Sequence, residues 1–178
     1  MCPASAGSRP RPVQKSMTNW REYPEKPVIG VGGVVIHNGR ALLIRRGGEP
    51  LKGEWSIPGG TLELGETLHA GVERELFEET GLRVRVLELI EVFERIFPGD
   101  AASTTRAQTS GAAAVAQRPQ YHFVIVDYLC AALDPSPAPR PGGDVTHVAF
   151  VSEEDLPRYG LTDAATRIIR KAFALARR

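Results

Sequence analysis

Three glutamates in one short stretch of the sequence have the chemistry to bind a metal ion together. The stretch predicts a helix from about Thr67 to Glu79 that stops at Gly81, because glycine tolerates the left-handed conformation that follows a helix end. At roughly 100° per residue, Glu75, Glu78 and Glu79 fall on one stripe of this helix. Carboxylates at this spacing repel one another, so a bare helix gains nothing from them. A hard divalent cation such as Mg²⁺ takes oxygen ligands and would turn the repulsion into binding.

The other residues of the predicted helix are consistent with a buried element that presents one face to a ligand. Leu68, Val72 and Leu76 recur every four residues and form an apolar stripe. Gly71 lies four residues before Glu75 and leaves that face clear for a bulky ligand, although glycine weakens a helix by about 1 kcal/mol relative to alanine. The alternative interpretation is a solvated, acid-rich amphipathic helix without a ligand.

The surrounding residues resemble the signature of the Nudix hydrolases. That signature is a glycine, five residues, a glutamate, seven residues, and then Arg-Glu-aliphatic-any-Glu-Glu-any-Gly-aliphatic. All nine specified positions match, namely Gly60, Glu66, Arg74, Glu75, Leu76, Glu78, Glu79, Gly81 and Leu82. The resemblance covers about 28–176 and implies an α/β/α sandwich with a mixed β-sheet and a loop-helix-loop catalytic motif. A more diffuse similarity, in the C-terminal pattern and in the strand YHFVIVDYL, points to the bacterial ADP-ribose pyrophosphatase branch.

The same resemblance implies roles for individual residues. The metal, Mg²⁺ or Mn²⁺, is expected on Glu75, Glu78 and Glu79, with a backbone carbonyl of Gly59 or Gly60 as a further ligand. The catalytic group is expected to consist of Glu78, Glu79, Arg74 and a general base, with Arg74 orienting a glutamate by an ion pair or contacting phosphate.

The general base of several Nudix enzymes comes from a loop beyond the signature. Asp144, which follows a proline-rich loop, is our candidate for it, with Glu91 or Glu94 as alternatives.

Three further residues are assigned to substrate binding. Arg45 and Arg46 follow a predicted strand and either grip phosphates or form a solvated strand end. Glu66 is a supporting carboxylate at the helix start, where negative charge suits the helix dipole. Trp55 could stack on a nucleobase, but packing beneath its loop is the favoured interpretation.

Length and composition indicate an ordinary globular protein. The chain has 178 residues, a net charge of +1, 24% charged and 42% hydrophobic residues, which fits one domain and does not indicate nucleic acid or a membrane as a partner. Cys2 and Cys130 lie in different contexts, which argues against a disulfide framework. Neither a run of about 18 apolar residues nor the apolar segment of a signal peptide is evident, so we expect a cytoplasmic protein.

We expect one folded domain at 28–178, preceded by a disordered tail at 1–27. The tail is rich in proline, serine and basic residues without a sustained period, and Met17 is an alternative start to Met1. Residues 100–119 contain seven alanines and no aromatic residue, which predicts a flexible insertion in a hairpin. A short helix at 111–117 is the alternative.

The remaining elements predict an α/β domain. An Asn-Gly pair favours a tight hairpin between two early apolar strands, and further strands follow the central helix. The expected strands are Val28–Ile36, Ala41–Ile44, one or two within Leu82–Phe93, Tyr121–Leu129 and Val145–Val151. Lys52–Gly60 is expected to be a loop, and Thr162–Ala176 a final helix.

The expected function is hydrolysis of a phosphoanhydride bond in a nucleoside diphosphate linked to another moiety. As the resemblance implies, ADP-ribose, cleaved to AMP and ribose 5-phosphate, is the leading substrate. The alternatives are a pyrophosphohydrolase acting on normal or oxidised nucleoside triphosphates, and a non-catalytic module that senses a nucleotide. A homodimer fits the habit of the family.

Overall fold

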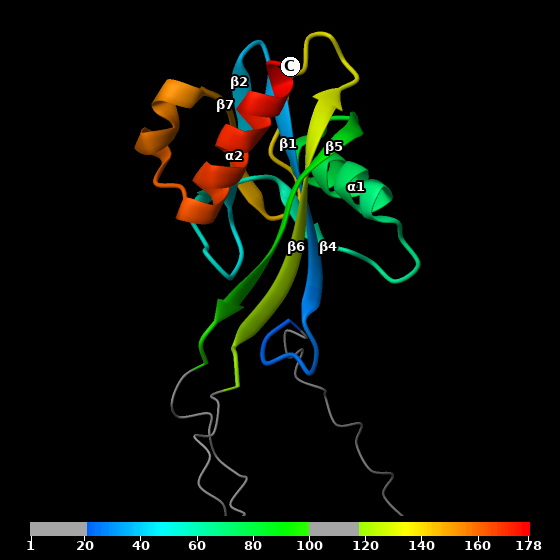
Figure 1. Ribbon diagram of the computed structural model, residues 1–178, viewed down its shortest axis with the longest axis vertical. Helices are drawn as coiled ribbons and strands as arrows, with labels where there is room; N and C mark the ends of the chain where they lie inside the picture. The colour runs from blue at the N-terminus through cyan, green and yellow to red at the C-terminus, as the bar shows by residue number, and fades with distance from the viewer. Residues whose placement is uncertain (1–20, 100–117) are drawn as a thin grey trace, which may run out of the picture.

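The computed structural model describes residues 21–99 and 118–178 (Figure 1). Most of the predicted tail and most of the predicted insertion therefore lie outside the described residues. Residues 21–27 precede the first strand, and the backbone N–H of Tyr23 donates to the carbonyl oxygen of Gln120 at 2.7 Å. The domain limits at 28–178 and the insertion at 100–119 remain predictions.

A hairpin begins the sheet at the predicted place. It joins β1 (Val28–His37) to β2 (Arg40–Arg46). Asn38 and Gly39 have φ of 48° and 69°, and two consecutive positive φ values give the backbone twist that suits a two-residue hairpin turn.

Three longer strands complete the sheet, namely β5 (Val84–Phe97), β6 (Tyr121–Ala132) and β7 (Val145–Ser152). The strand order is β3-β2-β1-β6-β5, and in addition β4 pairs with β1 and β7 pairs with β2. Since β1 and β6 run parallel while the other pairs are antiparallel, the sheet is mixed, as the family resemblance implies. β5 is a single strand whose register against β6 shifts twice.

Two short strands lie in Lys52–Gly60 and its continuation, where the sequence predicts a loop. β3 (Trp55–Ser56) pairs with β2, and β4 (Gly59–Thr61) pairs with β1. The loop prediction is therefore wrong for these residues. Strands of two and three residues are too short to show the alternation that identifies a strand in a sequence.

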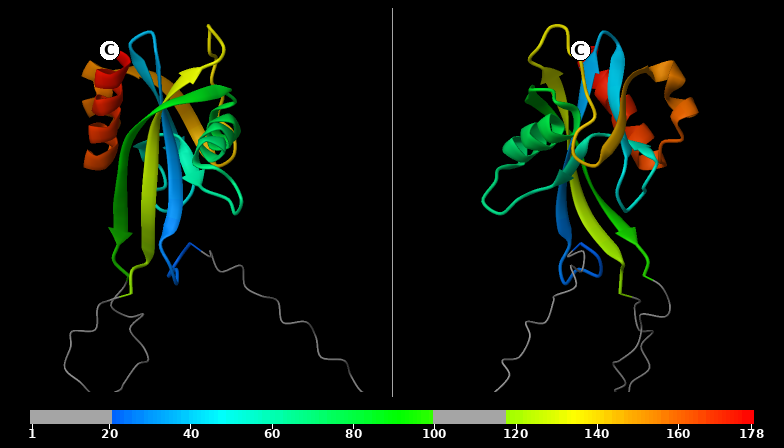
Figure 2. Two further views of the ribbon diagram at one scale, coloured as in Figure 1. Left: turned by 45° about the vertical axis from the view of Figure 1, so that its right-hand side comes forward. Right: turned by 180° about the vertical axis from the view of Figure 1, so that it is seen from behind.

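Two helices cover opposite faces of the sheet, α1 (Leu68–Thr80) and α2 (Asp163–Ala176) (Figure 2). A 3₁₀ helix, η2 (Glu153–Tyr159), lies between β7 and α2. No helix of the described residues combines the length and apolarity needed to span a bilayer.

The alternation of side chains along β1 creates two hydrophobic clusters. Val35 packs with Val72 and Leu76 of α1, whereas its neighbour Val34 packs with Ile168 of α2. All of these side chains are fully buried. The chain thus forms the predicted α/β/α sandwich, and the face of α1 that carries the glutamates is held against β1 and β4.

Candidate active site

The local sequence of α1 fixes where its glutamates lie. Thr67 begins the helix, and its Oγ1 accepts from the backbone N–H of Ala70 at 3.2 Å. Gly81, with a φ of 69°, ends it as predicted, and its N–H donates to the carbonyl oxygen of Phe77. With Val72 and Leu76 anchored in the core, the acidic stripe turns toward β4 and the loop that precedes it.

Arg74 is the centre of an ion-pair network on this stripe. Its Nε donates to Oε1 of Glu66 at 2.9 Å, and its Nη2 donates to Oε2 of Glu66 at 3.0 Å, which makes a bidentate pair. Its Nη1 donates to Oε1 of Glu75 at 2.9 Å and to Oε2 of Glu78 at 3.3 Å. The bonds from Glu66 and Glu75 raise the pKa of Arg74, and its proximity lowers the pKa of Glu66, so both remain charged.

Glu79 lies in a different environment. Its side chain is buried, and its Oε2 accepts from the backbone N–H of Gly59 at 2.8 Å. Burial raises the pKa of Glu79 to about 8, and the negative charges of Glu75 and Asp144 act in the same direction, while Arg46 opposes them. Burial also raises the pKa of Glu75, against the effect of Arg74.

Gly60 brings the backbone of β4 close to this acidic group. A Cβ atom on Gly60 would lie 2.4 Å from the carboxyl atoms of Glu75, so a side chain at this position would require the Glu75 carboxyl group to move. The predicted metal-binding residues Gly60, Glu75 and Glu79 are therefore neighbours.

The proline-rich loop before β7 is fastened to the end of α1. The N–H of Arg140 donates to the carbonyl oxygen of Thr80 at 2.9 Å, and the N–H of Gly142 donates to that of Glu79 at 3.0 Å. These bonds fix the backbone that leads to Asp144. The carboxylate of Asp144 lies close to Gly48, where an added Cβ atom would be 2.6 Å from Oδ2 of Asp144. Asp144 is thereby held beside Glu79, although the two residues are 65 positions apart in the chain.

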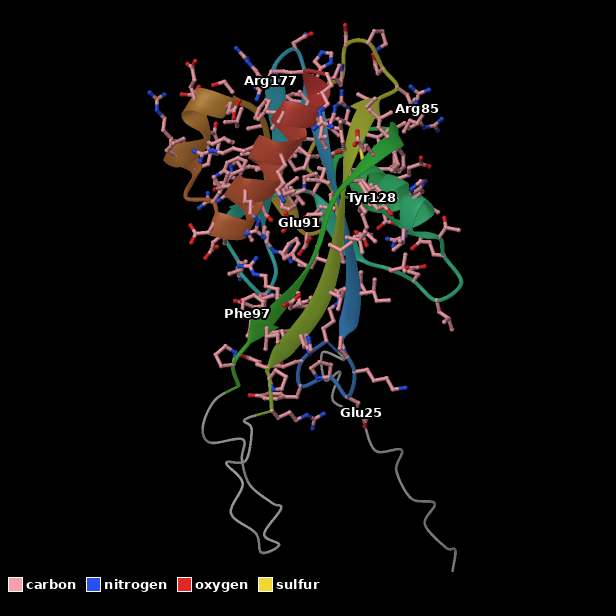
Figure 3. All side chains as sticks on the ribbon, viewed as in Figure 1. Glu25, Arg85, Glu91, Phe97, Tyr128 and Arg177 are labelled. Carbon is pink, nitrogen blue, oxygen red and sulfur yellow. The ribbon has the colours of Figure 1, made fainter. Side chains whose placement is uncertain are left out.

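A cavity of about 320 Å³ opens beside these groups. Its lining has a carboxylate end, formed by Glu75, Glu79 and Asp144 together with Gly60 and Arg46. Away from this end the lining is aromatic and carries a further cation, with Phe93, Arg95 and Phe97 from β5 and Phe123 from β6. Phe97 lies at the C-terminal end of β5, away from Glu91 (Figure 3). The guanidinium of Arg95 lies 5.1 Å from the centre of the Phe97 ring.

The two candidate phosphate-binding arginines are placed differently. Arg46 lines the cavity, with its Nε donating to the carbonyl oxygen of Pro50 at 3.0 Å. Arg45 is exposed, is not among the lining residues, and donates from its Nε to the carbonyl oxygen of Gly53 at 2.8 Å. The geometry therefore leaves Arg46 as the arginine that can meet a ligand in the cavity.

Other predicted site residues lie outside the cavity lining. Glu66, Arg74 and Glu78 form the network behind it. Glu91, an alternative base, is paired instead with Arg167 and Lys171 of α2. Glu94, the other alternative, is exposed and absent from the lining.

Trp55 packs in the way that the favoured interpretation predicts. Its ring lies 5.0 Å from that of Tyr159 in an edge-to-face contact, and 6.4 Å from that of His147.

The aromatic wall and one acidic residue of the cavity were missed by the sequence analysis. Asp127 lines the cavity and is only 3% exposed. The signal that could have found it is an acidic residue within the largely apolar strand YHFVIVDYL. The aromatic residues carry no comparable signal, because alternating aromatics in a strand usually indicate a core.

A family model described as the NUDIX domain matches residues 26–172. The chain belongs to the Nudix family. This finding confirms the resemblance seen in the sequence, and the mixed-sheet sandwich agrees with it.

Individual Nudix relatives match shorter parts of the chain. A MutT-like protein of Streptomyces ambofaciens is 46% identical over 84 residues, which are 47% of this chain and 53% of that protein. An ADP-ribose pyrophosphatase of Methanocaldococcus jannaschii is 42% identical over 80 residues, which are 45% of this chain and 47% of that protein. The chain thus spans about half the length of these curated relatives. The crystal structure of a MutT Nudix hydrolase from Burkholderia pseudomallei superposes with a TM-score of 0.60 and 28% identity, covering 83% of this chain and 98% of that one.

The acidic residues of this Nudix site have the right donor chemistry for a divalent cation. As the side chains stand, no three carboxylate, imidazole or thiol groups within 21–99 and 118–178 converge closely enough to hold a metal ion, because Glu75 and Glu78 are turned toward Arg74. Glu75 and Glu79 nevertheless line one cavity. Burial raises the pKa of each, and a cation bound nearby would lower both pKa values. Oxygen-only donors of this kind suit Mg²⁺ or Mn²⁺.

Proposed function

We propose that this Nudix protein hydrolyses the phosphoanhydride bond of a nucleoside diphosphate linked to another moiety, with ADP-ribose as the leading substrate and AMP and ribose 5-phosphate as its products. The observation that carries the proposal is that one cavity contains both a group of carboxylates and an aromatic wall. A nucleoside diphosphate derivative has the matching parts, a charged diphosphate and a flat base.

The two ends of the cavity suit the two ends of such a ligand. Phe93, Phe97 and Phe123 offer ring surfaces on which a base can stack, a contact worth about 1–3 kcal/mol in other nucleotide-binding proteins. Arg46 reaches the cavity at the carboxylate end and can pair with phosphate oxygens. The carboxylates themselves repel a diphosphate, so they require a cation to bind it.

That cation, Mg²⁺ or Mn²⁺ held by Glu75, Glu78 and Glu79, would neutralise phosphate charge and lower the pKa of bound water. Glu75 and Glu79 already line the cavity, and Glu75 and Glu78 would turn their carboxylates to the cation by exchanging part of their bonding to Arg74. Because Glu66 holds Arg74 through Nε and Nη2, and not through the Nη1 that Glu75 and Glu78 share, Arg74 keeps its position during this exchange. We therefore assign Arg74 to orienting the glutamates.

In the reaction, a water oxygen bonds to one phosphorus atom and the bridging P–O bond breaks. The water gives up a proton, and the leaving phosphate carries away the electron pair of the broken bond. Asp144 is proposed as the group that accepts the proton, because it is exposed, lines the cavity and lies beside Glu79.

Similarity to the ADP-ribose pyrophosphatase of Methanocaldococcus jannaschii supports ADP-ribose as the first substrate to test. The decisive experiment is a magnesium-dependent screen over ADP-ribose, other nucleotide sugars, dinucleotides, and normal and oxidised nucleoside triphosphates. Products are identified by mass, and the reaction is repeated in ¹⁸O-labelled water to find which phosphorus is attacked.

The expected result is release of AMP and ribose 5-phosphate with a much higher kcat/KM than for any triphosphate. Preferred cleavage of a triphosphate to a monophosphate and pyrophosphate would replace this substrate class by the alternative one. Tight binding of a nucleotide without turnover of any substrate would contradict the enzymatic proposal and favour a sensor.

A further inference from the structure

Asp127 is a buried carboxyl group that faces the cavity without a protein partner. It lies on β6, is 3% exposed, and contributes to the cavity lining. No hydrogen bond or ion pair joins its carboxyl group to any residue that the structure describes. Since the described residues include no fully buried side-chain oxygen without a partner, the Asp127 oxygens must reach the space of the cavity.

Glycine on the next strand makes room for this carboxyl group. Gly32 is the register partner of Asp127 on β1, and a Cβ atom there would lie 2.1 Å from Oδ1 of Asp127. Gly32 also pairs with Gly59, whose N–H donates to Glu79. Asp127 is thus separated from the carboxylate end of the site by two glycine backbones.

Toward the start of β6, Asp127 is next to the aromatic wall of the cavity. Side chains two positions apart on a strand share a face and lie about 7 Å apart, so Ile125 and then Phe123 continue the same row. Their partners on β5 are Phe93 and Arg95. Asp127 therefore lies between the carboxylates and the rings.

Its acidic neighbour is neutralised, whereas Asp127 is not. Glu91 is the register partner of Asp127 on β5, and it is bonded to Arg167 and Lys171. Burial raises the pKa of Asp127 to about 7, and Glu91 adds to the rise. A largely buried carboxyl group without a cation is a poor phosphate ligand and costs stability, but it is a good partner for neutral O–H donors.

In a nucleoside diphosphate, the part between the phosphates and the base is the ribose. We propose that Asp127 is a specificity-determining residue that binds the hydroxyl groups of the nucleoside ribose. This inference rests on the proposed function for the orientation of the ligand, with phosphates at Glu79 and the base at the rings.

The test measures binding, so that it does not depend on turnover. The affinities of the full chain for ADP, 2′-deoxy-ADP, 3′-deoxy-ADP and IDP are determined by calorimetry in magnesium buffer at pH 8. We expect ADP to bind about 10- to 100-fold more tightly than at least one deoxy analogue, which is the usual effect of losing one hydrogen bond to a charged group. Asp127→Val should reduce that ratio to about threefold or less, and Asp127→Asn, which keeps an acceptor oxygen, should give an intermediate ratio.

A control variant and a stability measurement show whether the Asp127 substitutions act on the ligand or only disturb the cavity wall. Ile125→Val trims the same wall two positions away without changing a polar group, and it should keep the wild-type ratio. The melting temperatures of both Asp127 variants should equal or exceed that of the wild type, because each removes a buried charge that has no protein partner.

Equal affinity of the wild type for ADP and both deoxy analogues, or no measurable ADP binding, would overturn the proposal. The proposal would also be overturned if Asp127→Val kept the wild-type ratio of affinities for ADP and the deoxy analogues. Loss of only the discrimination between ADP and IDP in that variant would overturn it too, because it would indicate that Asp127 contacts the amino group of the base. If ADP-ribose is not hydrolysed but the Asp127 variants still lose the preference for ADP over the deoxy analogues, the proposed function fails and this inference stands.

Discussion

The carboxylates of the site belong to two groups with opposite surroundings. On one side of α1, Glu66 and Glu75 share the guanidinium of Arg74. Inside the cavity, Glu79 and Asp127 are almost fully buried, and among the described residues no cationic side chain is bonded to either of them. The bonds from Arg74 lower the pKa of Glu66 and oppose the rise that burial causes in the pKa of Glu75, whereas burial raises the pKa of Glu79 to about 8 and that of Asp127 to about 7.

This difference separates positioning from ligand binding. A bidentate arginine pair fixes two side chains in place and is already satisfied without a ligand. A buried carboxyl group that lacks a counter-charge costs stability, and its retention is easiest to explain when a ligand supplies the missing partner. We expect changes in the cavity group to remove activity without harming the fold, and changes that break the bidentate pair of Arg74 and Glu66 to affect both.

The largest effect is expected for Glu79→Gln. The amide keeps the size of the side chain and can still accept from the Gly59 N–H, but it removes the negative charge that a cation needs. We expect kcat to fall by about 1,000-fold or more, with an unchanged or higher melting temperature. Magnesium-dependent hydrolysis and thermal unfolding are measured together.

Glu73→Gln is the matched control for that variant, because Glu73 is an exposed glutamate on the same helix and outside the cavity lining. It should behave like the wild type. Glu78→Gln should also abolish turnover while the fold remains intact. Full magnesium-dependent activity in either the Glu78 or the Glu79 variant would refute the role given to that residue.

A smaller loss, of about 100-fold in kcat/KM, is expected for Arg74→Lys. Lysine keeps the positive charge but cannot reproduce the bidentate contact with Glu66 or contact Glu75 at the same time. The comparison variant is Glu66→Gln. The double variant should lose no more kcat/KM than Arg74→Lys alone, since both changes disrupt the same ion-pair network. Additive losses would mean that Arg74 and Glu66 act separately.

Gly142→Ala tests the attachment of the loop that carries Asp144, with an expected loss of about tenfold in kcat. A Cβ atom at this position would lie 2.2 Å from the carbonyl oxygen of Glu78, so the loop must move away from α1. Ser136→Ala changes an exposed side chain of the same loop and serves as the control. If Gly142→Ala retains full activity, the attachment of the loop does not govern catalysis.

The helix and its glutamates could be predicted because local rules decide them. The capping residue Thr67, the stop at Gly81 and the 3.6-residue spacing all act within one element. Asp144 was found only from its order along the chain, and its position beside Glu79 depends on backbone bonds made by Gly142. The site assignments themselves remain predictions for the variants above to test.

The cavity wall could not be predicted because pairing between distant strands creates it. The register of β5 against β6 shifts twice before it pairs Glu91 with Asp127 and Phe93 with Ile125, and nothing in the sequence indicates either shift. A shift of one residue moves a side chain to the other face of a sheet. For the same reason the sequence could not choose between Arg45 and Arg46, which lie at a register shift between β2 and β7.

The effect of pH is expected in stability and not in turnover, as a shift of about ten degrees in melting temperature. In the unfolded chain Glu79 loses its proton near the ordinary glutamate pKa of 4.5, but in the folded chain only near 8. The unfolded state therefore releases the proton first, and without a divalent cation the unfolding free energy should fall as the pH rises from about 5 to about 8. Magnesium should raise the melting temperature more at pH 8 than at pH 5, because it binds the charged carboxylates. In Glu79→Gln the slope should flatten and most of the magnesium effect should disappear, leaving the smaller slope that Asp127 contributes below about pH 7. An unchanged slope in that variant would show that the buried carboxylates do not differ from the paired ones in the way their surroundings indicate.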